Sequence, residues 1–256
     1  MIMKRAFIRT LWGTPKSDYD NGWIDPSGRR KKMDKDIDFI LKSPYTSPFT
    51  TYVFGEENYN YLRSLNIDNC VLLDNRPFIY DLQKEFWRHK LDILKYAMEE
   101  DKYDEIVYID WDCLPIKMTD ENFWILLSKK SEIQANLQQY RRNKCKWRGK
   151  IDAKKVSNGG FIYIRDSKIP NALIKAWQEL PPAEKFWDEI AISKLMDKMM
   201  GGWQGIEQYF GKFEPDVCNL KKKSVFENKL IENTYFIHYI QSANNRKSKN
   251  DTLEQE

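Results

Sequence analysis

The chain has 256 residues, of which 41% are hydrophobic, 31% charged and 14% aromatic. This composition suits a folded protein with a full core and excludes a disordered or low-complexity chain. The net charge of +4 is small against 42 basic and 38 acidic residues, so overall charge does not by itself indicate a nucleic-acid-binding protein.

The first third of the sequence alternates between predicted strands and helices. Strands are expected at 5–12, 51–55 and 69–74, with a helix at 56–67 between the last two. The run Gly-Thr-Pro at 13–15 should end the first strand, and a polar loop at 20–35 leads to a short helical stretch at 36–43. The alternation predicts βαβ units and a mainly parallel sheet.

Residues 85–100 form the clearest predicted helix. Its apolar stripe follows i, i+4, i+7 and i+11 spacing and consists of Trp87, Leu91, Leu94 and Met98. A neighbouring polar arc holds Arg88, Asp92 and Lys95, which would form a surface charge cluster of i, i+3 and i, i+4 pairs in the absence of any function. His89 and Lys90 are expected to face solvent.

A strand is predicted at 105–109, and its four consecutive apolar residues, 106–109, run directly into Asp110, Trp111 and Asp112. Its composition fits a central parallel strand that is covered on both faces. Two carboxylates at the end of a buried strand call for a positive partner, and three hypotheses arise: a bound metal ion, a helix cap or a solvated turn. In open α/β sheets, ligands bind beyond the carboxyl ends of the strands, which is where these aspartates fall.

The second half contains predicted strands at 132–140, 158–164 and 235–240 and predicted helices at 171–180 and 188–200. A basic loop with an embedded tryptophan, Trp147, spans 141–150. Such a loop suits nucleic-acid binding, closure over a diphosphate or simple solvation. With no internal repeat and no long linker, we expect a single domain over 1–241 and a polar C-terminal tail at 242–256.

The four cysteines are widely separated and form no C-x-x-C pair. This spacing argues against structural zinc and favours free thiols in a reducing compartment. No apolar run has the length of a signal-peptide core or a membrane span. We therefore expect a cytoplasmic protein without a transmembrane segment.

Three separated motifs resemble the GT-A glycosyltransferases, in particular the branch with the yeast-type outer-chain mannosyltransferases and the glucosylating clostridial toxins. The motifs are TLWG at 10–13, KLDILKYA at 90–97 and YIDWDCLP at 108–115, and they span roughly residues 5 to 115. In that family a tryptophan ends the first strand, an S-D-x-x-R helix follows, and Y-x-D-x-D precedes a proline. The strand NGGFIYI at 158–164 resembles, more loosely, the acceptor side. The resemblance implies a mainly parallel α/β GT-A fold with a Rossmann-like nucleotide-binding half.

The resemblance also implies residues for the donor. Trp12 would stack on the nucleotide base, with Gly13 beside it in the same site, and a core tryptophan is the equal alternative. Asp92 would hydrogen-bond the sugar or ribose. Lys95 stands where the family has arginine and would meet the diphosphate or the sugar without the bidentate fork of a guanidinium.

For the metal, the resemblance implies that Asp110 and Asp112 hold a divalent ion that bridges the two phosphates. His238 lies in the late strand, where many GT-A enzymes place a further ligand. Its imidazole would shift the preference from Mg²⁺ towards Mn²⁺. The alternation of the strand puts His238 on one face with Phe236 and Ile240, which suits a buried core histidine equally well.

Two further groups have both a functional and a plain structural explanation. Asn158 and Gly159, with the glycine that follows, would bring the backbone close to a donor, or would form a simple β-bulge. Asp188 and Glu189 suit the dipole at a helix start. The family has an acidic residue near this point that faces the donor sugar or acceptor, so these two are the candidate catalytic residues.

Together these features predict a metal-dependent enzyme that transfers a sugar from a nucleoside diphosphate sugar to the hydroxyl of a glycan or other acceptor. The resemblance implies Mn²⁺ or Mg²⁺ as cofactor and retention of anomeric configuration, and we expect no nucleic-acid partner. One alternative is a sugar nucleotidyltransferase, but residues 12–20 supply only one Gly and one nearby Lys for a triphosphate loop. The other is a non-catalytic nucleic-acid binder that uses the loop at 141–150.

Overall fold

The protein is described by a computed structural model that covers residues 3–11, 14–16, 22–24, 30–31, 48–73, 88–111, 113–115, 117–128, 133–139, 155–182, 191–192, 194–195, 218–220 and 235–238. The helical stretch predicted at 36–43, the basic loop at 141–150 and the tail at 242–256 lie outside these residues.

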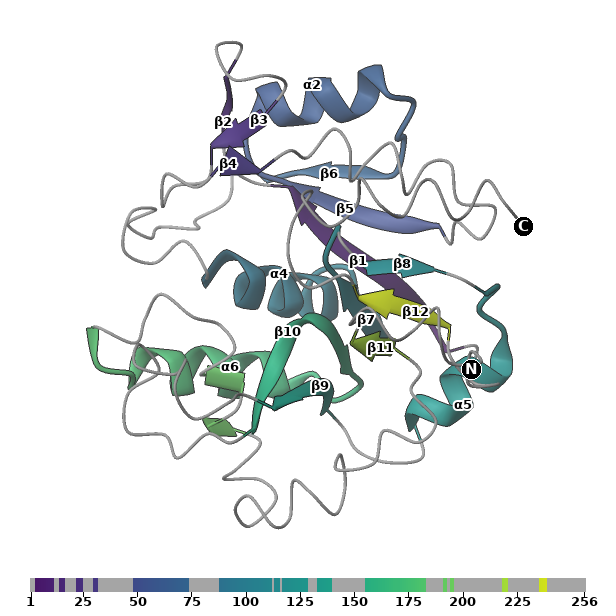
Figure 1. The fold of residues 1–256 in the computed structure, drawn as a ribbon, viewed down its shortest axis with the longest axis vertical. Coiled ribbons are helices and arrows are strands. Elements are labelled where there is room, and N and C mark those ends of the chain that lie inside the picture. The colour runs from purple at the N-terminus through teal and green to yellow at the C-terminus, as the bar shows by residue number, and fades with distance from the viewer. Residues whose placement is uncertain are drawn as a thin grey trace.

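A six-stranded sheet forms the centre of the fold (Figure 1). Its strands, in spatial order, are β6 (Cys70–Leu72), β5 (Phe49–Val53), β1 (Arg5–Leu11), β7 (Glu105–Ile109), β10 (Lys155–Ile164) and β9 (Ile133–Gln139). The first four are parallel, whereas β10 is antiparallel to both of its neighbours. The prediction of a mainly parallel α/β sheet is confirmed. The strand β7 is central and fully buried as expected, but only one of its two neighbours is parallel.

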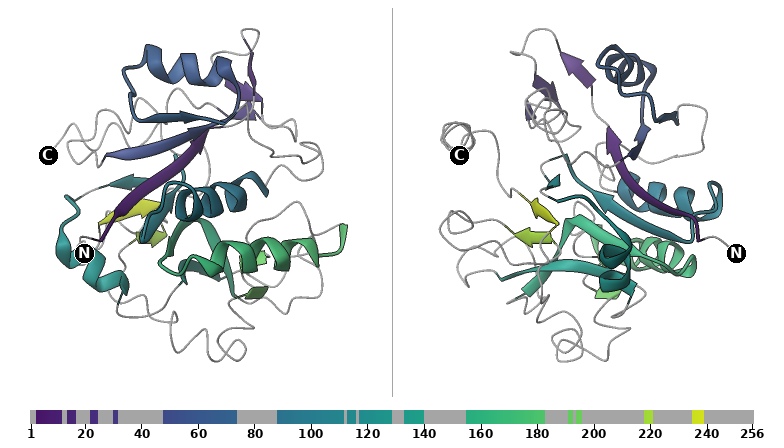
Figure 2. Two further views of the ribbon diagram at one scale, coloured as in Figure 1. Left: turned by 180° about the vertical axis from the view of Figure 1, so that it is seen from behind. Right: turned by 90° about the vertical axis from the view of Figure 1, so that its right-hand side faces the viewer.

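Helices α4 (Arg88–Glu99) and α6 (Lys168–Gln178) cover one face of this sheet (Figure 2). Their core includes Ile8 of β1 and Tyr108 of β7, together with Leu91 and Leu94 of the predicted helical stripe. Successive strand residues point to opposite faces, so Phe7 and Val107 belong to a second core on the other side. Helix α5 (Glu121–Ser128) and a second, three-stranded sheet cover that side.

The second sheet joins β11 (Cys218–Leu220), β12 (Phe236–His238) and β8 (Cys113–Pro115). Strand β8 follows β7 directly after the aspartates, and β12 is the short central part of the strand predicted at 235–240. The second sheet therefore ties the late segment of the chain to the end of β7.

A third cluster packs helix α2 (Glu56–Ser64) against the carboxyl end of β1 and β5 through Leu11, Val53 and Leu62. Beside it, β2 (Thr14–Lys16), β3 (Gly22–Ile24) and β4 (Arg30–Lys31) form a small antiparallel sheet. The prediction of a polar loop at 20–35 is wrong at these short strands. Thr14 and Pro15 open β2 instead of only ending the first strand, because an edge position leaves the proline nitrogen without a required hydrogen bond.

In the part of the chain that the structure describes, no helix is both long enough and apolar enough to cross a membrane. Cys70 and Cys113 are free thiols.

Candidate site at the carboxyl end of strand β7

The segment after β7 is a tight turn. The amide of Asp110 donates to the carbonyl of Gly160 on β10 at 2.8 Å, and the amide of Cys113 donates back to the carbonyl of Asp110 at 3.0 Å. The chain then enters β8 and not a helix. The helix-cap hypothesis for the paired aspartates is therefore wrong, and the turn hypothesis is correct for the backbone.

The positive charge that the strand end calls for is supplied by Lys90 of α4. Its Nζ lies 3.3 and 3.4 Å from the two carboxylate oxygens of Asp110 and donates to the carbonyl of Gly159 at 3.1 Å. The ammonium also lies 4.9 Å from the ring centroid of Tyr108, whose hydroxyl donates to Asp110 at 2.7 Å. Lys90 is only 3% exposed, while the Asp110 side chain is 34% exposed. The expectation that Lys90 and His89 face solvent is wrong, because both are buried.

Trp111, between the two aspartates, is held by β1. Its indole Nε1 donates to the carbonyl of Thr10 at 2.8 Å, and the guanidinium of Arg9 lies 3.8 Å from its ring centroid. Arg9 is 5% exposed and donates through Nε to Thr51 Oγ1 at 3.0 Å. Its Nη1 has no hydrogen-bond partner among the described residues. Burial lowers the pKa of Arg9 to about 9, which measures how unfavourable this position is for a charge.

The glycine segment predicted to approach a ligand lies directly beside Asp110. Gly159 and Gly160 are buried, and their carbonyls accept the hydrogen bonds from Lys90 and from the Asp110 amide. The pairing of β10 with β9 shifts register between Asn158 and Ile162, so this part of β10 contains the irregularity expected of a β-bulge. The segment therefore has the irregular pairing expected of a β-bulge or turn and adjoins the strand-end aspartate, while its close approach to a ligand stays a prediction.

The late histidine is brought to the same place by strand pairing. In the antiparallel pair of β12 and β8, His238 is the register partner of Cys113, the residue after Asp112. Such partners have Cα atoms about 4.5–5.5 Å apart. The backbone of His238 is thus next to the turn that carries both aspartates, although its side chain is not described.

The remaining predicted residues are less informative. Asp92 is buried and pairs with Arg88 at 3.4 Å, whereas Lys95 pairs with Glu99 at 3.6 Å. The expected surface cluster is therefore wrong in detail: its aspartate is buried, and its two described ion pairs are separate. The donor-binding roles of Asp92 and Lys95 stay predictions. Also predicted, but outside the described residues, are Trp12, Gly13, Asp112, Asp188 and Glu189, as is the side chain of Asn158.

Asp110 is the one predicted metal ligand whose side chain is described. Within the described ranges no three His, Cys, Asp or Glu side chains gather closely enough to hold a metal ion. The residue types nevertheless suit a divalent ion. Asp110 is an accessible carboxylate, a second aspartate follows it in the sequence, and the backbone of His238 pairs with Cys113 at the end of the same turn.

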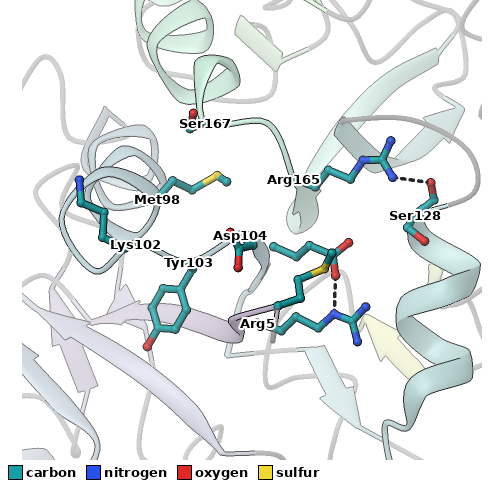
Figure 3. A pocket seen from close by; sticks show the side chains of 10 residues that line it. Arg5, Met98, Lys102, Tyr103, Asp104, Ser128, Arg165 and Ser167 are labelled. Atoms are coloured by element: carbon teal, nitrogen blue, oxygen red, sulfur yellow. Dashed lines mark hydrogen bonds and ion pairs between the residues drawn. The ribbon is translucent and has the colours of Figure 1, made fainter. Parts of the chain in front are cut away.

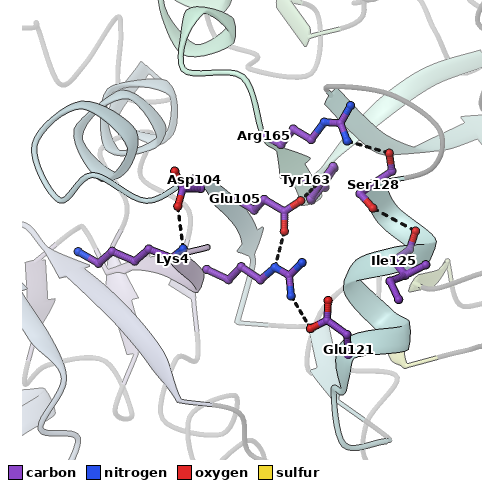
Figure 4. A network of polar contacts seen from close by, with 9 residues as sticks. Lys4, Asp104, Glu105, Glu121, Ile125, Ser128, Tyr163 and Arg165 are labelled. Carbon is purple, nitrogen blue, oxygen red and sulfur yellow. Dashed lines mark hydrogen bonds and ion pairs between the residues drawn. The ribbon is translucent and has the colours of Figure 1, made fainter. Parts of the chain in front are cut away.

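A separate cavity of about 780 Å³ opens at the opposite, amino end of β1 and β7 (Figure 3). Lys102 and Tyr103 lie on one side of it, and Arg165 and Ser128 on the other. Two of the side chains that line it pair with each other (Figure 4): Arg5 donates to Glu105 at 2.5 Å, and the same carboxylate accepts from Tyr163, outside the lining, at 2.8 Å. Ligands in open α/β folds bind at the carboxyl edge of the sheet, so this cavity at the amino edge is not the candidate donor site.

No protein-family model and no curated protein sequence matches this chain. Among solved structures, it is similar to the glycosyltransferase GlyE of Streptococcus pneumoniae TIGR4, with 14% identity over 94% of this chain and 55% of GlyE and a TM-score of 0.48. This chain therefore spans about half the length of GlyE.

Two further structures cover comparable shares of the chain. One is a glycosyltransferase involved in glycosylation of the major capsid of PBCV-1, with 11% identity over 98% of this chain and 99% of the other and a TM-score of 0.42. The other is a protein of Bacillus anthracis named for glucose-1-phosphate thymidylyltransferase activity, with 12% identity over 80% and 84% and a TM-score of 0.41. These broad likenesses include both of the transferase classes considered and do not separate them.

Proposed function

We propose that this chain is a metal-dependent glycosyltransferase of the GT-A type. It would transfer a sugar from a nucleoside diphosphate sugar to an acceptor hydroxyl, with retention of anomeric configuration. The donor would bind at the carboxyl edge of the central sheet, over the turn that follows β7.

One observation carries the proposal. Three segments that were predicted separately, and that lie far apart in the sequence, meet at one edge of the sheet. Asp110 is hydrogen-bonded to Gly160, and Cys113 is the register partner of His238. A solvated turn has no need of a bulged glycine strand on one side and a histidine-bearing strand on the other.

Asp110, Asp112 and His238 would hold the divalent ion, and the ion supplies positive charge to the leaving diphosphate as a Lewis acid. The described part of the chain contributes the framework. The hydrogen bond from Trp111 to Thr10 and its stacking with Arg9 hold the turn against β1. The bulge at Gly159 and Gly160 removes side chains from the backbone that adjoins Asp110. A turn held in this way loses little further freedom when it binds a donor.

The proposal is tested by calorimetric titration with UDP- and GDP-sugars in the presence of Mn²⁺ and then of excess EDTA. We expect one of the two nucleotides to bind with Mn²⁺, and binding to weaken at least tenfold in EDTA and in Asp110→Asn. Asp68→Asn is the matched control, because the Asp68 side chain is 78% exposed and its ion pair with Arg63 lies on the surface. The proposal would be refuted if the nucleotide affinity is unchanged both in EDTA and in Asp110→Asn, or if neither nucleotide binds.

A further inference from the structure

Lys90 is a buried cation at the predicted metal site, and no prediction from the sequence gave it a role there. We propose that Lys90 is a built-in counter-charge for the strand-end aspartates, and that it makes the divalent ion and the nucleoside diphosphate bind together instead of ion first. This inference rests on the proposed function and specifies how the same site is regulated by charge.

The geometry ties Lys90 to the aspartate and not merely to the core. Its ammonium spans both carboxylate oxygens of Asp110, at 3.3 and 3.4 Å, and also donates to the carbonyl of Gly159 at 3.1 Å. It therefore joins the two segments, the turn and the bulge, that would border the donor. Asp110 retains 34% exposure on its other side, so the pairing leaves the carboxylate accessible.

Burying the ammonium of Lys90 costs free energy, and a positive charge is needed at this position only if the site has a use for it. Burying an ammonium carries a large desolvation penalty, and apolar residues of similar volume often replace a buried ion pair without loss of stability. Ile93 and Leu94, one helical turn after Lys90 on the same face of α4, are fully buried, so an apolar side chain at position 90 would have continued the core. A lysine at 3% exposure is therefore better explained by its effect on Asp110 than by packing.

The charge has opposite consequences for the two ligands. The ammonium of Lys90 offsets one negative charge at the turn, so a divalent ion alone is attracted less than it would be without Lys90. A nucleoside diphosphate carries negative charge, and the same ammonium attracts it. Lys90 thus disfavours the ion alone and favours the ion accompanied by a diphosphate, which is a positive coupling between the two ligands.

The test compares wild type with Lys90→Met, which keeps an unbranched chain without the charge, and with Lys90→Arg, which restores the charge. Lys175→Met is the matched control, since Lys175 is exposed on α6. Two quantities are measured in each protein: the affinity for Mn²⁺ alone, from the electron paramagnetic resonance of free Mn²⁺, and the affinity for UDP and GDP at saturating Mn²⁺. Circular dichroism confirms that each variant is folded.

In Lys90→Met we expect Mn²⁺ alone to bind about tenfold more tightly and the nucleoside diphosphate about tenfold more weakly, with Lys90→Arg and Lys175→Met close to wild type. A purely structural role would weaken both ligands together or neither, and either result overturns the inference. If wild type binds neither nucleotide, the proposed function fails on its own. The Mn²⁺ measurement then still decides the role of Lys90: tighter binding in Lys90→Met supports it, and unchanged or weaker binding refutes it.

Discussion

Two arginines on the same strand should differ in how much stability the same substitution removes. Arg9 is buried and has no carboxylate partner among the described residues, whereas Arg5 pairs with the buried Glu105 at 2.5 Å. We expect Arg9→Met to leave the free energy of unfolding within about 2 kcal/mol of wild type. We expect Arg5→Met to lower it by about 3–5 kcal/mol, because it leaves a buried carboxylate without its cation.

The magnitude for Arg9 follows from its surroundings. Burial lowers its pKa from the ordinary value to about 9, equivalent to about 5 kcal/mol against the charged form. The hydrogen bond to Thr51 recovers about 1.5–3 kcal/mol, since its donor is charged. The rings of Trp111 and Phe49, at 3.8 and 4.6 Å from the guanidinium, recover about 1–2 kcal/mol each. The cost of burying the charge and the gain from these contacts nearly cancel, so removing the guanidinium should change the free energy of unfolding little.

The assay is urea unfolding of wild type, Arg9→Met and Arg5→Met at pH 7, followed by circular dichroism with m-values compared. A loss of 3 kcal/mol or more in Arg9→Met would show that the guanidinium has a strong anionic partner, and would refute the reasoning. Equal losses in the two variants would do the same.

Three further outcomes are expected. Gly55 has φ +93°, a backbone conformation that strains an alanine, so Gly55→Ala should lower the free energy of unfolding in urea by about 1–2 kcal/mol. An unchanged midpoint of urea unfolding would show that alanine is not strained at this position. Burial first, and the hydrogen bond to Asp101 second, raise the pKa of Tyr52. The stability it provides is therefore present below its unfolded pKa of 10.0 and lost as the pH rises above that value, where the unfolded chain releases the proton and the folded chain retains it. Tyr52→Phe should lose less stability than wild type between pH 9 and about 11, and equal losses would argue against this assignment. Trp12→Ala should weaken nucleoside diphosphate binding by about 1–3 kcal/mol by calorimetry, whereas unchanged affinity in a less stable protein would make Trp12 a core residue.

The elements that the sequence predicted well are those in which the local pattern of apolar residues indicates which side chains are buried. Residues 106–109 of strand β7 are an uninterrupted apolar run, and Leu91, Leu94 and Met98 of α4 recur at helical spacing, so each signals its burial without reference to the rest of the chain. The strands of the small sheet, of two or three residues each, have no such pattern. Tertiary pairing alone creates them, which is why the polar loop prediction missed them.

The same distinction applies to the site. The contrast between an apolar strand and a carboxylate is visible in adjacent residues and marks Asp110 as a candidate, whereas its role as a metal ligand is implied by the resemblance to the GT-A glycosyltransferases. Lys90 was missed because lysine is almost always exposed, and its partner lies in another element. Only the packing of α4 against β7 brings the two together. The available signal was that Lys90 has apolar residues at i+3, i+4 and i+7, namely Ile93, Leu94 and Ala97, which puts it on an apolar helix face, but helical periodicity alone does not name the partner.

The central claim, that a divalent ion and a nucleoside diphosphate bind at the turn after β7, is tested most directly by anomalous diffraction at the manganese edge. The crystals would contain Mn²⁺ and either UDP or GDP. The account predicts an anomalous peak about 2.0–2.2 Å from a carboxylate oxygen of Asp110 or Asp112, with the diphosphate on the same ion. A nucleotide and ion bound together at the amino end of the sheet, or a manganese peak with no aspartate of this turn in contact, would contradict it.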